Sequence, residues 1–216
     1  MSRDDLFKAI DVADETMLRR LLGKDPSLAS SRSSDGVSAV LFTLYLAKHD
    51  LTKALLDHKP DLDIFDLSAL NMVEELSALL ENESNIDQVS GDGFSALHLA
   101  CFFGATDAAA LLITQGANVN IHAGNMSDLR PIHSASAAGQ GAIVHLLLQA
   151  GAKPNVIQAG GYTPLMVSAS LGNAPVVDML LEYGADISVK SDDDRMAADF
   201  AKAAGFEGLL PKLIVS

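Results

Sequence analysis

The sequence predicts an all-α solenoid, a single row in which short pairs of helices stack one after another. Segments of nearly equal length recur along the 216 residues, and each holds two short apolar stretches at helical spacing. Hydrophobic residues make up 49% of the chain, yet only 5% are aromatic and none is tryptophan. This composition favours close packing of small side chains between neighbouring units over one large enclosed core.

The clearest segment runs from Gly93 to Asn120. Ser95 is suited to begin a helix, because its hydroxyl can accept a hydrogen bond from a free amide of the first turn. Gly104 then ends that helix, since glycine readily adopts the left-handed conformation that closes a helical turn. A second helix is expected from about Asp107 to Gly116. The unit therefore consists of two helices followed by an extended turn.

The unit recurs with a nearly constant period. Equivalent helix-start positions fall at Ser95, Arg130, Thr163 and Met196, which are 35, 33 and 33 residues apart. The stretches RPIHSASAAG and TPLMVSASLG open two of these units. A period near 33 with a TPLH-like opening resembles the ankyrin repeat, and the resemblance covers nearly the whole chain. It implies an ankyrin-repeat solenoid of helix-turn-helix units joined by short β-hairpin turns, here called fingers.

The chain is expected to form one domain of successive units with a cap at each end. The first unit has apolar residues at helical spacing but no finger, which is typical of a cap that ends a stack in water. In the last unit, helices are expected over 197–203 and 209–214, with Gly205 between them and Pro211 in a first turn. The expected units are 2–34 (N-terminal cap), 35–63, 64–90 (truncated), 91–124, 125–158, 159–191 and 192–216 (C-terminal cap).

The 35–63 unit departs from the pattern at both helix ends. Ala47 replaces the glycine between its helices, and Lys59 stands where the second helix would end in glycine. A left-handed conformation at a lysine costs about 1 kcal/mol. We therefore expect the second helix of this unit to end in a different way.

The 64–90 unit is too short to be a full repeat. Ser38 and Ser95 are 57 residues apart, so one repeat of 33 leaves only 24 residues for the other. Those residues align with the N-terminal cap, Phe65 with Phe7. We expect two helices without a finger, which leaves a gap in the row of fingers. The rival interpretation, two separate arrays, would leave the first with two repeats, fewer than the roughly three that stability requires.

The charge balance limits the kinds of partner. Acids outnumber Lys and Arg 28 to 15, a formal net charge of -13. Phosphate recognition needs clustered bases, so a nucleic acid and an anionic membrane are both disfavoured as partners. The acidity either keeps the array soluble or attracts a protein with a basic rim, and both interpretations remain open. A monomer is expected.

The sequence contains no evident signal for secretion or for insertion into a membrane. The start MSRDDLFKAI has acids where a signal peptide needs an apolar run, and no apolar stretch is long enough to cross a bilayer. Cys101 is the only cysteine and cannot form an internal disulfide. We expect a soluble, cytoplasmic protein, and export stays an open question.

Few residues are candidates for catalysis or metal binding. His98 and His133 hold the fourth position of the TPLH-like opening in successive units, but two histidines are too few ligands for a metal site. The resemblance implies structural hydrogen bonds for them. Cys101 is expected to be a buried, inert thiol, and the run 192–194 of aspartates is expected to be a solvated turn. The sequence predicts no catalytic residue, no cofactor and no metal, and hence no enzyme.

The aromatic residues suggest where a partner would bind. The resemblance implies that the concave face is lined by the residue before each helix start and by the two residues before each inter-helix glycine. The residues expected to bind a partner are Tyr45, Leu46, Phe94, Phe102, Phe103, Leu129, Tyr162 and Leu171. Acids at Asp92, Asp128 and Asp193 would form a polar rim. An exposed apolar patch of this kind usually marks an interaction site.

The surface position of these aromatic residues has one alternative: Phe102 or Phe103 could instead pack against a neighbouring unit. The sequence favours a non-enzymatic module that binds a protein partner on its concave, aromatic-lined face. A structural or self-assembling scaffold is the alternative, and an uncharacterised enzyme or metal-binding protein is the minor one.

Overall fold

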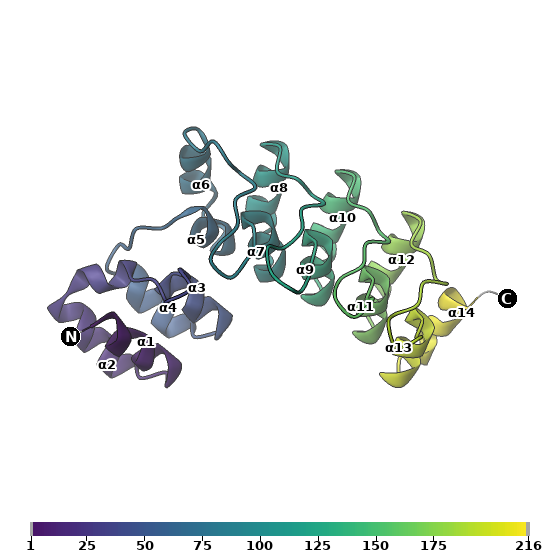
Figure 1. The fold of residues 1–216 in the computed structure, drawn as a ribbon, viewed down its shortest axis with the longest axis horizontal. Helices are drawn as coiled ribbons and strands as arrows, with labels where there is room; N and C mark the ends of the chain where they lie inside the picture. Colours follow the sequence, from purple (N-terminus) through teal and green to yellow (C-terminus); the bar gives the residue numbers. More distant parts are fainter. Residues whose placement is uncertain (1, 215–216) are drawn as a thin grey trace.

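The computed structural model describes residues 2–214, which form helices and no sheet (Figure 1). The helices are α1 (Arg3–Asp11), α2 (Glu15–Lys24), η1 (Pro26–Ser30), α3 (Ala39–Tyr45), α4 (His49–Leu56), α5 (Ile64–Ala69), α6 (Val73–Leu80), α7 (Ala96–Phe103), α8 (Thr106–Thr114), α9 (Pro131–Ala137), α10 (Gly141–Gln149), α11 (Pro164–Ser170), α12 (Ala174–Glu182), α13 (Ala197–Ala203), η2 (Glu207–Leu209) and α14 (Leu210–Leu213). The predicted all-α solenoid is confirmed. Residues 215 and 216 of the expected C-terminal cap lie outside the described residues.

The helices pack as two parallel rows (Figure 1). The inner row consists of α5, α7, α9, α11 and α13, each in contact with the next, and α3 extends it at the N-terminal end. The outer row contains α6, α8, α10 and α12, and every outer helix also packs on the inner helix of its own unit. Small residues such as Ala100, Ala135 and Ala169 are fully buried between the inner helices, which lets successive backbones approach closely.

The inner helices begin at local hydrogen bonds that the sequence encodes. The hydroxyl oxygens of Ser38, Ser95 and Thr163 each accept a hydrogen bond from the backbone N–H three residues later. Arg130 has no such oxygen. There the backbone N–H of Arg130 donates to His133 Nδ1 at 3.0 Å, and proline occupies the first helical position.

The second helix of the 35–63 unit ends in the same way as its glycine-terminated counterparts. Lys59 adopts a φ of 49° and Ala47 a φ of 52°, both in the left-handed region. The N–H of Lys59 donates to the carbonyl of Leu56 at 2.9 Å. The expectation that this helix closes differently is wrong, because Lys59 forms the same left-handed turn as Gly116, Gly151 and Gly184 despite the strain at a lysine.

Three of the fingers are turns closed by single β-bridges. The bridges join Arg32 to Ser38, Val89 to Ser95 and Gln158 to Tyr162. Backbone hydrogen bonds then link neighbouring fingers, as between the N–H of Gly124 and the carbonyl of Gly93 at 2.6 Å. Only residues 57–63 connect α4 to α5, whereas residues 81–95 connect α6 to α7, so the truncated unit has no finger.

The fingers on either side of the truncated unit touch each other. A Cβ atom on Gly91 would lie 1.5 Å from the carbonyl oxygen of Asp35, so only glycine fits at this contact. At the end of α3, the hydroxyl of Tyr45 donates to Asp92 Oδ2 at 2.6 Å. The expected gap in the row of fingers is therefore closed, because the chain bends until the two flanking fingers meet.

This bend opens the outer side of the row. The helices α4 and α6 do not stack on each other as α2 does on α4 and as α6 does on α8. The first four helices accordingly lie turned relative to the rest of the row (Figure 1). The buried apolar side chains form two clusters, one within α1–α4 and one that begins at Val37 and Leu41 and continues along the remaining units, and Phe42 and Leu62 pack against both. We call α1–α4 the N-terminal block.

None of the described helices combines the length and apolarity needed to cross a bilayer.

Candidate functional site

The predicted binding residues lie where inner helices end or in the fingers before them. Leu46, Phe102 and Leu171, at the ends of α3, α7 and α11, have exposed fractions of 38%, 47% and 49%. The remaining five, Tyr45, Phe94, Phe103, Leu129 and Tyr162, are half-buried. Val37, which the resemblance also places on the concave face, is buried.

The two phenylalanines at the end of α7 differ in their surroundings. Phe102 is exposed, whereas Phe103 packs its ring against Tyr45 of α3 with a centroid distance of 5.6 Å. The rings of Phe102 and Phe103 meet edge-on at 5.1 Å. Phe103 therefore helps to close the bend, and Phe102 remains on the surface.

A hollow of about 210 Å³ lies beside Phe102. Its apolar lining comes from three units and consists of Tyr45, Phe94, Leu99, Phe102, Leu129 and Ala137. His98, His133 and Ser134 complete the lining. We call this space the apolar hollow.

The two histidines present satisfied rings to the apolar hollow. His98 Nε2 donates to the carbonyl of Leu129 at 3.1 Å, so its Nδ1 accepts from the hydroxyl of Ser95 at 2.8 Å. His133 Nε2 donates likewise to the carbonyl of Val156 at 3.2 Å. Burial lowers the pKa of each histidine to about 4. Both rings are thus neutral at pH 7, and both nitrogens of each ring are already hydrogen-bonded within the protein.

A larger, open hollow of about 580 Å³ lies on the other side of Tyr45. Phe7, Val37 and Phe42 contribute apolar surface, and the charged lining residues are Arg3, Asp4, Lys8, Asp11, Asp35 and Asp92. Burial raises the pKa of Tyr45, so its hydroxyl stays protonated and donates to Asp92. We call this space the acidic hollow. Sequence reasoning missed the contribution of α1, because that contribution depends on the bend.

Tyr162 belongs to a separate aromatic group further along the row. Its ring meets that of Phe200 in α13 at 5.6 Å, and the guanidinium of Arg195 lies 4.2 Å from the centre of the Phe200 ring. The predicted binding residues therefore include two separate aromatic groups, one around Phe102 and one around Tyr162.

The predicted rim acids differ in their partners. Asp128 lies 2.5 Å from His122 and 3.2 Å from Arg130, and Asp193 lies 2.5 Å from Arg195. The hydrogen bond from His122 holds the pKa of Asp128 below its usual value. Asp92 accepts hydrogen bonds from Tyr45 and Ser90 and lines the acidic hollow. Of the three rim acids, only Asp92 lines either hollow.

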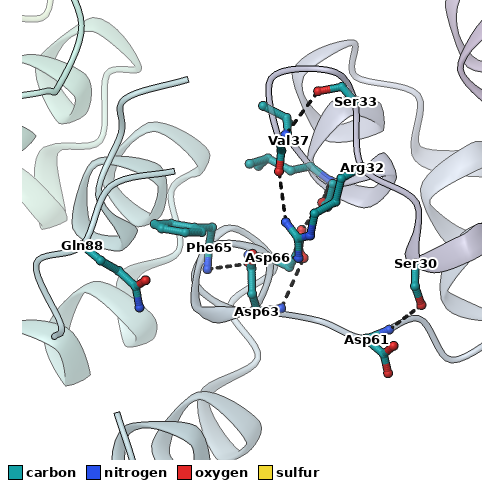
Figure 2. A network of polar contacts seen from close by, with 12 residues as sticks. Ser30, Arg32, Ser33, Val37, Asp61, Asp63, Phe65, Asp66 and Gln88 are labelled. Carbon is teal, nitrogen blue, oxygen red and sulfur yellow. Dashed lines mark hydrogen bonds and ion pairs between the residues drawn. The ribbon is translucent and has the colours of Figure 1, made fainter. Parts of the chain in front are cut away.

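A polar network centred on a buried carboxyl group joins the N-terminal block to the rest of the row (Figure 2). Asp66 of α5 is fully buried and accepts a hydrogen bond from the hydroxyl of Ser38. Arg32 pairs with Asp63 at 2.9 Å, and the N–H of Asp63 donates to Asp66 Oδ2 at 3.3 Å. Burial, with a smaller contribution from the nearby Asp63 carboxylate, raises the pKa of Asp66 to about 7.

The described residues assemble little that could catalyse a reaction. Cys101 is fully buried, and burial raises the pKa of its thiol well above the usual value. No three His, Cys, Asp or Glu side chains within residues 2–214 are grouped so as to hold a metal ion. The geometry is that of a helical repeat array with exposed aromatic and aliphatic side chains at the ends of its inner helices.

Comparison with known proteins identifies the class of this array. A family model described as "Ankyrin repeats (3 copies)" matches residues 64–158 and 123–191, which together make up more than half of the chain. The chain belongs to the ankyrin repeat family. Ankyrin repeats are in general modules for binding other proteins and have no catalytic activity of their own.

The relatives differ greatly in how much of their length is matched. Ankyrin repeat protein nuc-2 of Neurospora crassa is 35% identical over 153 residues, which is 70% of this chain and 14% of that protein. Human Rabankyrin-5 is 35% identical over 138 residues, 58% of this chain and 12% of that protein. The chain thus spans a small part of these larger relatives. The probable 26S proteasome regulatory subunit p28 of Saccharomyces cerevisiae is 23% identical over 217 residues, 93% of this chain and 94% of that protein.

Proposed function

We propose that this chain is a non-enzymatic binding module that takes up a protein partner on its concave, aromatic-lined face. The observation that carries the proposal is the exposure of Leu46, Phe102 and Leu171 at equivalent ends of three inner helices. Large apolar side chains cost free energy when they face water, and burying one contributes about 1.5–3 kcal/mol. A few such contacts are enough to form the centre of an interface.

The scaffold supports this role. Backbone hydrogen bonds between fingers and the packing of the inner helices hold the face in place before a partner arrives. A preorganised surface loses little conformational entropy on binding. The yeast p28 protein, which matches this chain along almost its whole length, is described as a probable regulatory subunit of a larger assembly, and such a role depends on contact with other proteins.

The proposed partner is a protein, with neither nucleic acid nor membrane bound, and the chain acts as a monomer. The net charge of -13 supports this, since it disfavours both polyanions and close approach of a second copy. It also favours a partner with a basic rim. Light scattering tests the self-assembly alternative, because a mass that rises with concentration would contradict the monomer.

Phe102→Ala tests the proposed face. We expect wild-type chain to retain a specific protein from a lysate and the variant to lose most of it, with the melting temperature changed by only a few degrees because Phe102 is half exposed. Tyr183→Ala is the matched control. Tyr183 is 39% exposed at the end of the outer helix α12, so its loss should leave capture intact. Equal capture by wild type and Phe102→Ala would count against the concave face.

A further inference from the structure

The apolar hollow and the acidic hollow adjoin at a single side chain. Tyr45 lines both, with its ring against Phe103 and its hydroxyl on Asp92. This arrangement exists only because the bend brings the end of α3 against the end of α7. A partner segment that lies across Tyr45 would therefore meet both hollows at once.

The apolar hollow fits an apolar side chain. Its volume of about 210 Å³ lies below the roughly 300 Å³ at which small-molecule pockets usually begin. Both ring nitrogens of His98 and of His133 are already hydrogen-bonded within the protein. Apart from the hydroxyl of Ser134, the hollow therefore offers an occupant apolar contact surface.

The acidic hollow fits a cation. Four carboxylates and two bases line it, and Arg3 is paired with Asp4 at 3.2 Å. Among the described residues, Lys8, Asp11, Asp35 and Asp92 form no ion pair within 4.0 Å. Three carboxylates thus stand against one lysine in a space open to solvent. An ammonium or guanidinium group from a partner would restore the balance.

We propose that the partner docks through a segment in which a large apolar side chain enters the apolar hollow and a Lys or Arg, two to four residues away, enters the acidic hollow. The spacing of two to four residues follows because only the ring of Tyr45 separates the two hollows. Side chains two apart on an extended strand lie on one face at about 7 Å, and those three or four apart do so on a helix. The proposal rests on the proposed function and specifies its ligand.

A second copy of this chain is a poorer occupant. At a net charge of -13, a further copy brings mostly carboxylates toward carboxylates, and such juxtaposition is repulsive. The charge of the acidic hollow thus selects a basic protein segment.

A random peptide library displayed on phage and selected on the immobilised full chain tests the proposal. We expect the enriched sequences to share Leu, Ile, Met or Phe with a Lys or Arg two to four positions away. A labelled synthetic copy of the most enriched peptide is then titrated by fluorescence anisotropy. No enrichment, or enriched sequences without this pair, would overturn the proposal.

Two variants locate the peptide. Ala137→Leu places a larger side chain at the exposed edge of the apolar hollow and should weaken binding by about tenfold, or 1.4 kcal/mol. Asp11→Asn with Asp35→Asn removes two exposed charges of the acidic hollow and should weaken binding at low salt by about threefold and flatten its salt dependence. The control, Asp50→Asn with Glu74→Gln, removes two exposed charges from α4 and α6 and should change neither.

The outcomes also separate this proposal from the proposed function. The two-hollow assignment would be overturned if the peptides bound the Ala137→Leu variant as tightly as wild type but bound the Leu171→Arg variant more weakly. That result would leave the concave face as the binding surface. Peptides unaffected by both variants would count against the hollows and the concave face alike.

Discussion

The hydroxyl of Ser136 is fully buried in the inner row and has no hydrogen-bond partner among the described residues. The equivalent positions of the neighbouring units hold Cys101 and Ala169, both fully buried. Packing between inner helices at this position thus requires a small side chain but no polar group. A buried hydroxyl without a partner loses its hydrogen bonds to water and gains nothing in return.

Ser136→Ala should therefore stabilise the fold by about 1 kcal/mol, measured as the change in the free energy of unfolding in urea. Ser168→Ala is the matched control. Ser168 is equally buried but donates to the carbonyl of Pro164 at 2.9 Å, so its loss should give no gain. A Ser136→Ala variant less stable than wild type would contradict this account.

At the scale of the helix, the strained ends of α3 and α4 show how strongly the repeat geometry outweighs local preference. Lys59 keeps a φ of 49° where the three units from residue 91 to 191 use Gly116, Gly151 and Gly184. The N–H of Lys59 still reaches the carbonyl of Leu56, so the turn is formed despite the strained backbone. The helix end is set by the packing of the unit as a whole.

Lys59→Gly should relieve this strain and raise the free energy of unfolding by about 0.5–1 kcal/mol. The reverse change is the control. Gly116 ends α8 with a φ of 91°, and a Cβ there would meet no heavy atom within 4 Å. Gly116→Ala should therefore cost about 1 kcal/mol through the backbone alone. A lower urea midpoint for Lys59→Gly would show that the lysine side chain contributes more than the strain costs.

At the scale of the whole molecule, the joint between the N-terminal block and the remaining units depends on a carboxyl group whose pKa is raised to about 7. An aspartate in the unfolded chain has a pKa near 3.9. Folding therefore takes up a proton at Asp66 between these values. The stabilising contribution of this group is complete below about pH 4 and is lost as the pH rises through about 7.

Asp66→Asn should remove this dependence. Relative to wild type, the variant should gain about 2.5 kcal/mol of stability between pH 5 and pH 8, measured by urea unfolding at each pH. His98 and His133 titrate in both proteins, so their effect cancels in the difference. Asp61→Asn, an exposed carboxylate in the same connection, is the control and should show no such trend. A difference between Asp66→Asn and wild type that does not change with pH would contradict the assignment.

The sequence predicted most of the repeat geometry because that geometry is local. Ser95 and Gly104 mark the bounds of α7, and the expected helix over 197–203 coincides with α13. The missing finger of the truncated unit also followed from counting residues. The helix ends depend on residues within one turn, and the missing finger depends only on repeat length, so one sequence was enough.

The features that failed to follow from the sequence depend on contacts between distant residues. The bend rests on the touching backbones of Asp35 and Gly91, and nothing local to either residue predicts it. The sequence placed Phe102 and Phe103 on one surface, yet only the second packs on Tyr45. Successive helical residues point about 100° apart, so one faced the bend and the other did not. The acidic hollow was missed for the same reason.

The shortened repeat changes which parts of the chain can cooperate. In a regular stack, side chains two repeats apart are separated by the repeat between them and contact different parts of a bound molecule. Here the absence of one finger lets the array bend, and the ring of Tyr45 packs against that of Phe103. Recognition where the two hollows adjoin thus depends on the length of the truncated unit. An insertion that restored the missing finger would separate Tyr45 from Phe103 and abolish this site, although every side chain that lines it would still be present.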